Sequence, residues 1–192
     1  ANTFYNEEVK ITGERYTSRE FMEKELSKLW SKVWNIGGWS RELEKKGDFI
    51  THNIGRESIL MVKDKNDTIR AYHNVCPHRG NRLVQVDTGY VKDFTCTYHG
   101  WKFNYSGDLI YAQDAEDFPQ GNPCGKVKLS EIPCEEYGGF IWYNMDKNCF
   151  PLRGFLGEVT KYIDLYDNEG LKRVYHKVCE AVSYTHLRAH ET

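Results

Sequence analysis

The sequence of 192 residues lacks any long hydrophobic run. Its longest strongly apolar stretches are residues 59–62 and 140–143, whereas a membrane-spanning helix needs about 20 apolar residues. The N-terminus also lacks the basic region followed by an apolar region that marks a secretory signal. We therefore expect a soluble, cytoplasmic protein with no membrane partner.

The sequence also lacks an excess of charge of either sign. Lys and Arg total 26 and Asp and Glu total 28, so the formal net charge is −2. This balance removes the electrostatic basis for general binding to nucleic acids. Internal repeats and low-complexity tracts are absent as well. Hydrophobic residues make up 40% of the chain and aromatic residues 14%, which predicts a globular protein with a packed core.

Six cysteines are present, but the chain is long for a disulfide scaffold and has no export signal. Reduced thiols or metal ligands are therefore the better interpretation. Cys76 and Cys96 each have a histidine close behind them. Neither His52 nor His73 has an evident partner, and the remaining cysteines are interpreted as buried or loop thiols. These are Cys124, Cys134, Cys149 and Cys179.

The first part of the chain has the pattern of a helix. Apolar residues recur at helical spacing over residues 22–33, and Thr17 with Glu20 fits a capping box at the helix start. Residues 35–39 break this period. From about Asp48 the pattern changes to short strands. The strands are expected at residues 49–54, 58–62, 68–75, 101–105, 109–111, 127–132 and 139–144.

Two further segments follow or interrupt this β region. Residues 155–166 are amphipathic enough for a short helix, and residues 171–182 fit a strand. Residues 114–125 are interpreted as a long polar loop. Its acidic residues Asp114, Glu116 and Asp117 resemble a cation site, but a solvated loop is the simpler interpretation.

The chemistry of the chain is concentrated in two short motifs, Cys76–His78 and Cys96–His99. Each motif supplies one thiolate and one imidazole, which are ligands for transition metals and iron–sulfur clusters. A structural zinc site usually pairs like residues within one knuckle. Two mixed motifs suit a two-iron cluster in which two Cys bind one iron and two His bind the other. A zinc-stabilised interaction module remains the alternative from another class.

The residues around these ligands favour a rigid site. Gly80 and Gly100 lack a Cβ atom, which allows the backbone to approach a cluster closely. Pro77 has a fixed φ and stiffens the first motif. Strands before and after the motifs are expected to hold both loops at the tip of a β scaffold.

The segments Cys76–Asn81 and Cys96–Trp101 resemble the Rieske [2Fe–2S] signature. More narrowly, the chain resembles the large (α) subunit of Rieske non-haem iron oxygenases, the ring-hydroxylating dioxygenase group. The likeness covers about residues 15–182. It includes the N-terminal amphipathic helix, Gly47–Phe49, Asn74–Gly80, His99–Phe103 and Gly138–Trp142.

The resemblance implies a mainly β fold: a Rieske domain with a helical N-terminal extension and the truncated start of an α+β catalytic domain. The expected divisions are residues 1–44, 45–150 and 151–182, with a non-native tail expected at 183–192. Cys76, Cys96, His78 and His99 would bind the cluster. The implied function is the relay of single electrons from a ferredoxin or reductase to a mononuclear Fe(II) in the missing catalytic domain. There O2-dependent hydroxylation of a small organic substrate would occur, within a homo-oligomer, a trimer, of the full-length parent. The fragment alone is not expected to hydroxylate anything.

Differences from two other groups of Rieske proteins indicate which branch the chain resembles. Respiratory Rieske proteins carry an extra Cys in each cluster loop, whereas this chain has Asn81 and Tyr98 there. A free-standing Rieske ferredoxin remains an alternative, although it would be about half as long and would not need the N-terminal helix. His186 and His190 are spaced as a ligand pair, but no acidic residue fits beside them, so they are not assigned to the catalytic iron.

Overall fold

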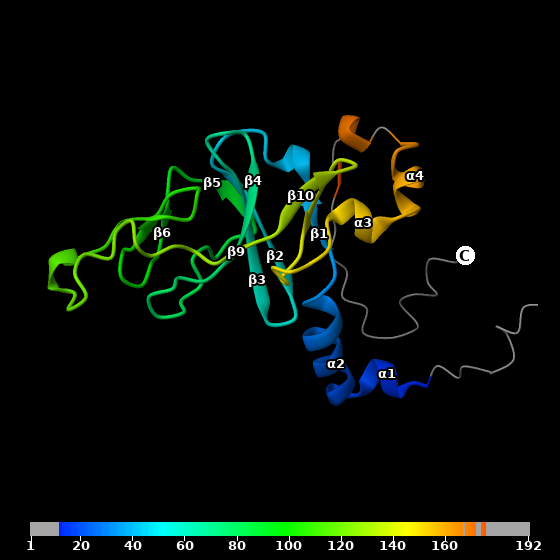
Figure 1. The fold of residues 1–192 in the computed structure, drawn as a ribbon, viewed down its shortest axis with the longest axis horizontal. Helices are drawn as coiled ribbons and strands as arrows, with labels where there is room; N and C mark the ends of the chain where they lie inside the picture. Colours follow the sequence, from blue (N-terminus) through cyan, green and yellow to red (C-terminus); the bar gives the residue numbers. More distant parts are fainter. Residues whose placement is uncertain (1–11, 167, 172–173, 176–192) are drawn as a thin grey trace, which may run out of the picture.

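Strands dominate the chain, as Figure 1 shows. The computed structural model describes residues 12–166, 168–171 and 174–175. The mainly β fold predicted from the sequence is confirmed by this arrangement. All eleven strands of the described residues belong to one antiparallel sheet of five strands and two smaller ones that lie on either side of it.

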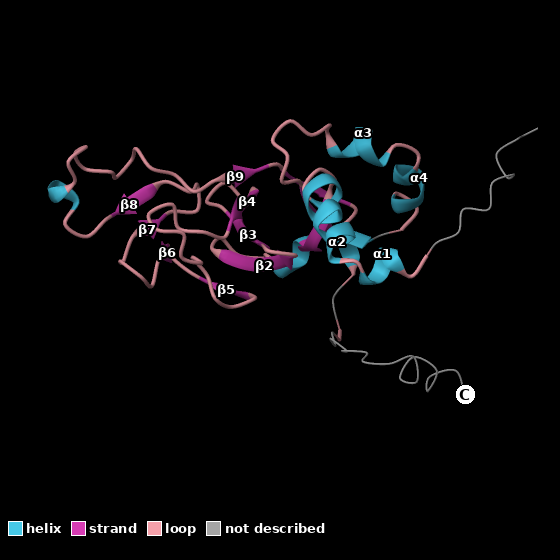
Figure 2. Cartoon of the chain, turned by 90° about the horizontal axis from the view of Figure 1, so that it is seen from below, coloured by secondary structure: helices cyan, strands magenta, loops and turns pink. Residues whose placement is uncertain are grey.

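The central sheet has the strand order β5 (Thr88–Tyr90), β2 (Asp48–Ile54), β3 (Glu57–Lys63), β4 (Ile69–His73) and β9 (Glu131–Ile132). A second sheet has the order β1 (Asn35–Trp39), β11 (Phe140–Tyr143) and β10 (Cys134–Tyr137). The third has the order β6 (Phe94–Thr95), β7 (Lys102–Phe103) and β8 (Leu109–Tyr111). Figure 2 shows this third sheet at the end of the molecule opposite the α helices.

Strand β3 explains the apolar run at residues 59–62. Leu60 and Val62 pack into the core next to the β6–β8 sheet, while Ile59 and Met61 pack into the core next to the β1–β11–β10 sheet. All four side chains have 0% exposure. A strand buried on both faces needs apolar residues at every position, and each contributes about 1.5–3 kcal/mol through burial.

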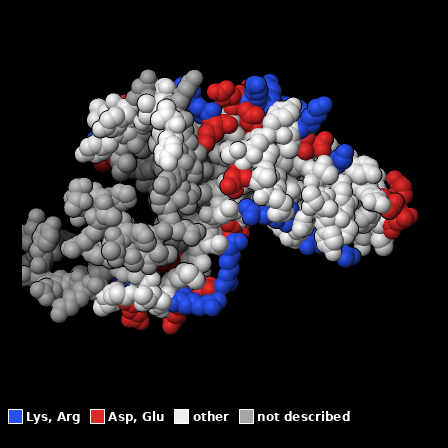
Figure 3. All heavy atoms as spheres, turned by 180° about the vertical axis from the view of Figure 1, so that it is seen from behind, with Lys and Arg blue, Asp and Glu red and all other residues white. Residues whose placement is uncertain are grey.

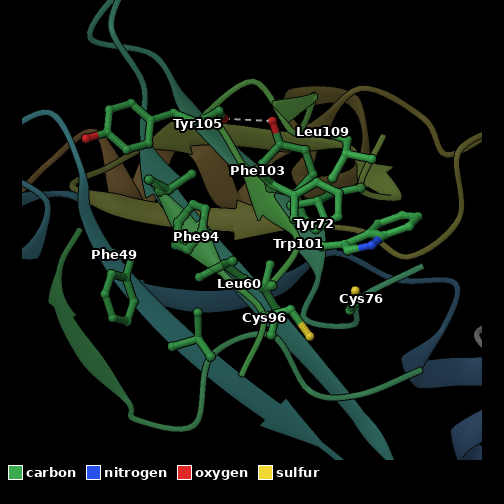
Figure 4. Packing of buried hydrophobic residues seen from close by; sticks show 14 of the residues in the cluster. Phe49, Leu60, Tyr72, Cys76, Phe94, Cys96, Trp101, Phe103, Tyr105 and Leu109 are labelled. Carbon is green, nitrogen blue, oxygen red and sulfur yellow. Dashed lines mark hydrogen bonds between the residues drawn. The ribbon is translucent and has the colours of Figure 1, made fainter. Parts of the chain in front are cut away.

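The core next to the β6–β8 sheet also holds both cysteines of the predicted metal motifs. Cys76 and Cys96 lie in this core together with aromatic residues from several strands (Figure 4). The Tyr72 hydroxyl donates a hydrogen bond to the Tyr105 carbonyl over 2.9 Å within it. The cluster loops are therefore anchored directly in packed core rather than in mobile surface structure.

The N-terminal helix is built differently from the prediction. It consists of α1 (Glu14–Thr17), α2 (Arg19–Glu25) and a π-helical turn, η1 (Leu26–Trp30). The capping box is wrong, because Ser18 is the N-cap of α2 and its hydroxyl accepts a hydrogen bond from the Phe21 backbone N–H at 3.2 Å. Glu20 instead accepts a hydrogen bond from Lys24.

Four strands, β1, β5, β6 and β10, were not predicted, and β7 and β9 are much shorter than predicted. Residues 35–39, interpreted as a break, form β1, which pairs with β11 through a register shift between Ile36 and Gly38. Strand β10 was also missed. The strand expected at 127–132 is limited to β9, although Lys128 forms an isolated bridge with Asp108. These elements are stabilised by partners distant in sequence, which local patterns do not reveal.

The segment after Pro151 contains α3 (Leu152–Leu156) and α4 (Val159–Ile163) where one helix was expected. The remaining short turns are η2 (Ser40–Glu42), η3 (Ala115–Asp117) and η4 (Asn168–Gly170). Of the predicted strand at 171–182, residues 171, 174 and 175 are described, and they form no strand. The predicted tail at 183–192, with His186, His190 and the earlier Cys179, lies outside the described residues.

Charges of both signs are interspersed over the face shown in Figure 3. Acidic side chains gather at the end of the molecule that η3 occupies. In the part of the chain that the structure describes, every helix is too short or too polar to traverse a lipid bilayer.

Candidate metal centre

The two predicted metal motifs fold into loops with the same backbone hydrogen bonds. In the first loop, the Cys76 N–H donates to the Asn81 carbonyl at 2.8 Å, and the Gly80 N–H donates to the Cys76 carbonyl at 2.9 Å. In the second, the Cys96 N–H donates to the Trp101 carbonyl at 2.8 Å, and the Gly100 N–H donates to the Cys96 carbonyl at 3.0 Å. Each loop is therefore closed at the same two positions.

This shared turn accounts for the two glycines. Gly80 has a φ of 70° and Gly100 a φ of 67°, which is the left-handed region. A side chain there costs about 1–2 kcal/mol, so glycine is the residue that the turn requires. The structure thus supplies a conformational reason for glycine, in addition to the close approach inferred from the sequence.

Both cysteine sulfurs are buried and surrounded by N–H donors. Cys76 has 1% exposure and Cys96 has 2%, and Figure 4 places both sulfurs on one side of the core, near the Trp101 indole. The backbone N–H groups of His78 and Arg79 point at the Cys76 sulfur. In the second loop, the equivalent donors to Cys96 are the N–H groups of Tyr98 and His99. Such donors favour a thiolate bound to metal.

The two thiols differ in acidity. Burial raises the pKa of the Cys76 thiol to about 11, and its contact with Cys96 acts in the same direction. Burial also acts to raise the pKa of Cys96, but hydrogen bonds from the Tyr98 N–H, the Cys76 side chain and the His99 N–H outweigh it and lower that pKa.

The two histidines meet between the loops, although they occupy different positions in them. His78 follows its cysteine by two residues and His99 by three, yet their ring centroids lie 4.7 Å apart at an interplanar angle of 69°. The structure thus brings all four predicted site residues to one end of the β scaffold. Burial, followed by the positive charges of His99 and Arg79, lowers the pKa of His78. That shift favours the neutral imidazole, the form that binds metal.

The residues present fit a bound metal group. Nδ1 of His78 is buried and has no hydrogen-bond partner among the described residues. An unpaired buried nitrogen costs about 1–3 kcal/mol, which a metal bond at that atom would offset. Two buried thiols and two imidazoles are also the mixed donor set of a Rieske cluster.

Two histidines outside the motifs have side-chain partners that the sequence did not predict. His52 was expected to have no partner, but its Nδ1 lies 2.8 Å from the Tyr143 hydroxyl. His73 was also expected to be free, but its Nδ1 lies 3.3 Å from Glu57 Oε2. Both partners are on other strands, so the sequence gives no local sign of them. Neither histidine joins the site.

The remaining candidates outside the motifs form no ligand set. Cys124, Cys134 and Cys149 are free thiols that are partly buried. Across the described part of the chain, the four motif residues included, no three His, Cys, Asp or Glu side chains are grouped around a single metal ion, and a two-iron cluster needs only two protein ligands for each iron. The acidic loop around η3 accordingly has no such arrangement.

Sequence reasoning gave no role to two side chains that contact the site. The Asn81 amide Nδ2 lies 3.8 Å from the Cys96 sulfur, and the Trp101 indole stacks on the His78 ring with centroids 4.5 Å apart and planes inclined by 6°. Both residues follow the cysteine of their own loop by five positions. That shared position is the signal in the sequence that could have drawn attention to them.

Comparison with known proteins defines the class. Residues 33–129 match the family model described as "Rieske [2Fe-2S] domain". The chain therefore belongs to the Rieske family, and the [2Fe–2S] cofactor predicted from the sequence is confirmed as the cofactor of that family.

Its relatives are oxygenase subunits, as the resemblance implied. The chain is 34% identical to biphenyl 2,3-dioxygenase subunit alpha of Rhodococcus jostii, over 78% of this chain and 32% of the relative. It is 35% identical to the carnitine monooxygenase oxygenase subunit of Escherichia coli, over 69% of this chain and 35% of the relative. The chain thus spans about a third of the length of these curated relatives.

Solved structures similar to this chain are also Rieske oxygenases. A quaternary ammonium Rieske monooxygenase, whose description mentions carnitine oxidation and inter-subunit electron transfer, superposes with a TM-score of 0.73 at 29% identity, covering 79% of this chain and 41% of that one. Naphthalene 1,2-dioxygenase superposes with a TM-score of 0.71 at 30% identity, covering 78% and 34%.

Proposed function

We propose that this chain is the electron-transfer part of a Rieske non-haem iron oxygenase. It accepts single electrons from a ferredoxin or a reductase and passes them to a mononuclear Fe(II). The observation that carries this proposal is the meeting of two buried cysteines and two histidines at the tip of two matched loops, with Nδ1 of His78 buried and unpaired. The oxygenase relatives support the assignment to that branch of the family.

The proposed ligand set divides the four residues between two irons. Cys76 and Cys96 hold one iron, and His78 and His99 hold the other. When bound, the cluster supplies one-electron redox chemistry. The chain itself keeps the sulfurs out of water, directs backbone N–H groups at them and holds the imidazoles in place. A site that is already formed rearranges little when its charge changes, which favours rapid electron transfer.

The acceptor is proposed to lie in the part of the relatives that this chain does not span. In this proposal residues 1–44 are the N-terminal extension, 45–150 the Rieske domain and 151–182 the start of a catalytic domain. Strand β1, near the end of the extension, pairs with β11 of the Rieske domain. The longer protein would hydroxylate a small organic substrate with O2 in the cytoplasm, as a homo-oligomer, a trimer. The relative whose description mentions inter-subunit electron transfer supports electron flow between subunits.

Spectroscopy of the chain expressed and purified without oxygen tests the electron-transfer role. We expect a brown protein with visible absorption, two iron and two sulfide ions per chain, and an EPR signal after one-electron reduction. A colourless protein that contains zinc would overturn the proposal in favour of an interaction module.

A second measurement separates an oxygenase component from a free-standing carrier. The longer protein, purified with both metal centres, is reduced in a stopped-flow instrument and mixed with O2 and an aromatic or quaternary ammonium substrate. We expect the cluster to be reoxidised together with formation of hydroxylated product. Reoxidation only by an added acceptor protein, without product, would identify a Rieske-type ferredoxin instead.

A further inference from the structure

Each cluster loop reaches across to a proposed ligand on the other loop. Asn81 closes the first loop through its backbone carbonyl, and its side chain points to Cys96 in the second. Trp101 closes the second loop in the same way, and its ring stacks on His78 in the first. The two contacts are therefore reciprocal and start from equivalent positions.

The Asn81 side chain gives the Cys96 sulfur a hydrogen-bond donor in addition to the backbone N–H groups that point at each cysteine sulfur. Backbone N–H groups at the same two loop positions point at each sulfur. The Asn81 amide Nδ2 adds a side-chain donor 3.8 Å from the Cys96 sulfur. The same amide lies 3.0 Å from the Arg82 carbonyl and 3.5 Å from the Thr97 hydroxyl, which fixes its direction.

The Trp101 contact restrains the orientation of one imidazole. Its indole is nearly parallel to the His78 ring, at 6° and 4.5 Å between centroids. Phe118 packs edge-on against both rings, with centroids 6.4 Å from His78 and 5.8 Å from Trp101. Trp101 has 5% exposure, so it is itself held by the core. His99 has a different neighbour, the exposed Tyr98.

We propose that Asn81 and Trp101 are positioning residues that tune the cluster across the loops: Asn81 by donating a hydrogen bond to the Cys96 sulfur, and Trp101 by fixing the His78 ring plane. This inference rests on the proposed ligand set. Reduction adds negative charge to the cluster, and an N–H donor at a ligand sulfur stabilises that charge. Asn81 therefore raises the reduction potential.

Two substitutions of Asn81 test its donor role. Asn81→Leu removes the amide, and Asn81→Asp keeps its shape while replacing the donor with a carboxylate. Protein-film voltammetry is expected to give the highest midpoint potential for the wild type, a lower one for Asn81→Leu and the lowest for Asn81→Asp. Asn66→Leu is the matched control, because Asn66 is exposed in a turn away from the site, and its potential is expected to stay unchanged.

Nitrogen hyperfine couplings measured by ENDOR on the reduced protein test the Trp101 role. Trp101→Leu is expected to shift the coupling of one histidine ligand and leave the other unchanged, while Trp101→Phe returns it toward the wild-type value. Phe118 packs against the same two rings, and Phe118→Leu is a smaller change that is expected to shift the same coupling less. Loss of packing alone would lower the melting temperature without this pattern.

Different experimental results would contradict the proposed function and the roles of Asn81 and Trp101. Absence of an iron–sulfur signal in the wild type would contradict the proposed function. Native iron and sulfide content in both Asn81 variants with wild-type potentials would overturn the donor role. Unchanged hyperfine couplings in Trp101→Leu and Phe118→Leu proteins that retain the cluster would overturn the positioning role. In both of those cases the proposed function would stand.

Discussion

The Tyr143 hydroxyl lies 2.8 Å from Nδ1 of His52, and this contact joins the central sheet to the β1–β11–β10 sheet. The two rings meet edge to face, with centroids 5.7 Å apart and an interplanar angle of 63°. Burial lowers the pKa of His52 and raises that of Tyr143. Both groups are therefore held in their neutral forms between two layers of the fold.

The contact between His52 and Tyr143 predicts that the free energy of unfolding decreases at acidic pH. Because the pKa of His52 in the folded protein lies below its ordinary value of 6.5, the unfolded state binds a proton more readily as pH falls below about 6.5. The His52 contribution to the free energy of unfolding is thus complete above that pH and is lost as pH falls through the folded pKa. Urea titrations of the wild type and His52→Gln between about pH 5 and 8 measure it. A pH slope that is the same in both proteins would contradict the prediction.

The proposed ligands predict which cysteines the cluster needs. Cys76→Ser and Cys96→Ser should each lose the visible absorption and most of the iron, because a serine is a poor ligand in a site built for thiolates. Destabilised loops should follow, since metal binding contributes to their folding. Iron and sulfide analysis provides the measurement. Cys124→Ser and Cys149→Ser are the controls and should retain the cluster; wild-type iron content in Cys76→Ser would refute the assignment.

The left-handed glycines predict a third result. Gly80→Ala and Gly100→Ala should each lower the free energy of unfolding by about 1–2 kcal/mol, because a Cβ atom is unfavourable at these φ angles. Steric clash is not the cause, since nothing lies within 4 Å of a Cβ placed at either residue. Gly154→Ala is the matched control: it is equally open but lies in helix α3, so we expect stabilisation of up to about 1 kcal/mol. Chemical denaturation decides between these outcomes, and equal effects at all three glycines would speak against the backbone argument.

The buried carboxylate of Asp64 predicts a larger loss. Its side chain accepts hydrogen bonds from the Asn66 and Thr68 backbone N–H groups and from Arg70 Nε at 2.8 Å. Burial acts to raise the pKa of Asp64, but these bonds, led by the one from Arg70, outweigh it and lower the pKa. Asp64→Ala should reduce the free energy of unfolding by about 3 kcal/mol, because two backbone N–H groups lose a charged acceptor, while Arg70 keeps its second partner, Glu131.

An exposed ion pair provides the comparison for that variant. Glu20→Gln breaks a pair with Lys24 in which both side chains are mostly in water, so it should have little effect on the free energy of unfolding. Calorimetric melting of both variants tests the contrast. A loss at Asp64 as small as that at Glu20 would show that the turn at residues 64–68 does not depend on the carboxylate.

Local patterns predicted the features that depend on neighbouring residues. The residue pattern at 58–62 predicted a strand, and the two Cys/His motifs predicted two ligand loops. Neither depends on knowledge of the surrounding fold, because strand patterns and metal preference follow from residue type and spacing. The same reasoning also found β2, β4 and the β7–β8 hairpin, with errors at their ends.

Features that depend on distant partners could not be predicted. Strand β1 contains two adjacent glycines and reads as a break, and it is a strand because β11 pairs with it. His52 and Tyr143 are 91 positions apart in the sequence. The Asn81 contact with Cys96 likewise depends on how two loops face one another. In each case the information lies in the packing of separate segments, which sequence periodicity does not contain.

The two-sided burial of β3 has a consequence for how the molecule comes apart. Since alternate residues of this strand belong to the core at the metal end and to the core at the opposite side, neither core can open without exposing the strand that the other needs. The backbone amides of Leu60 and Met61 should therefore exchange with deuterium only through complete unfolding, and loss of the cluster should loosen its own loops long before it releases these amides.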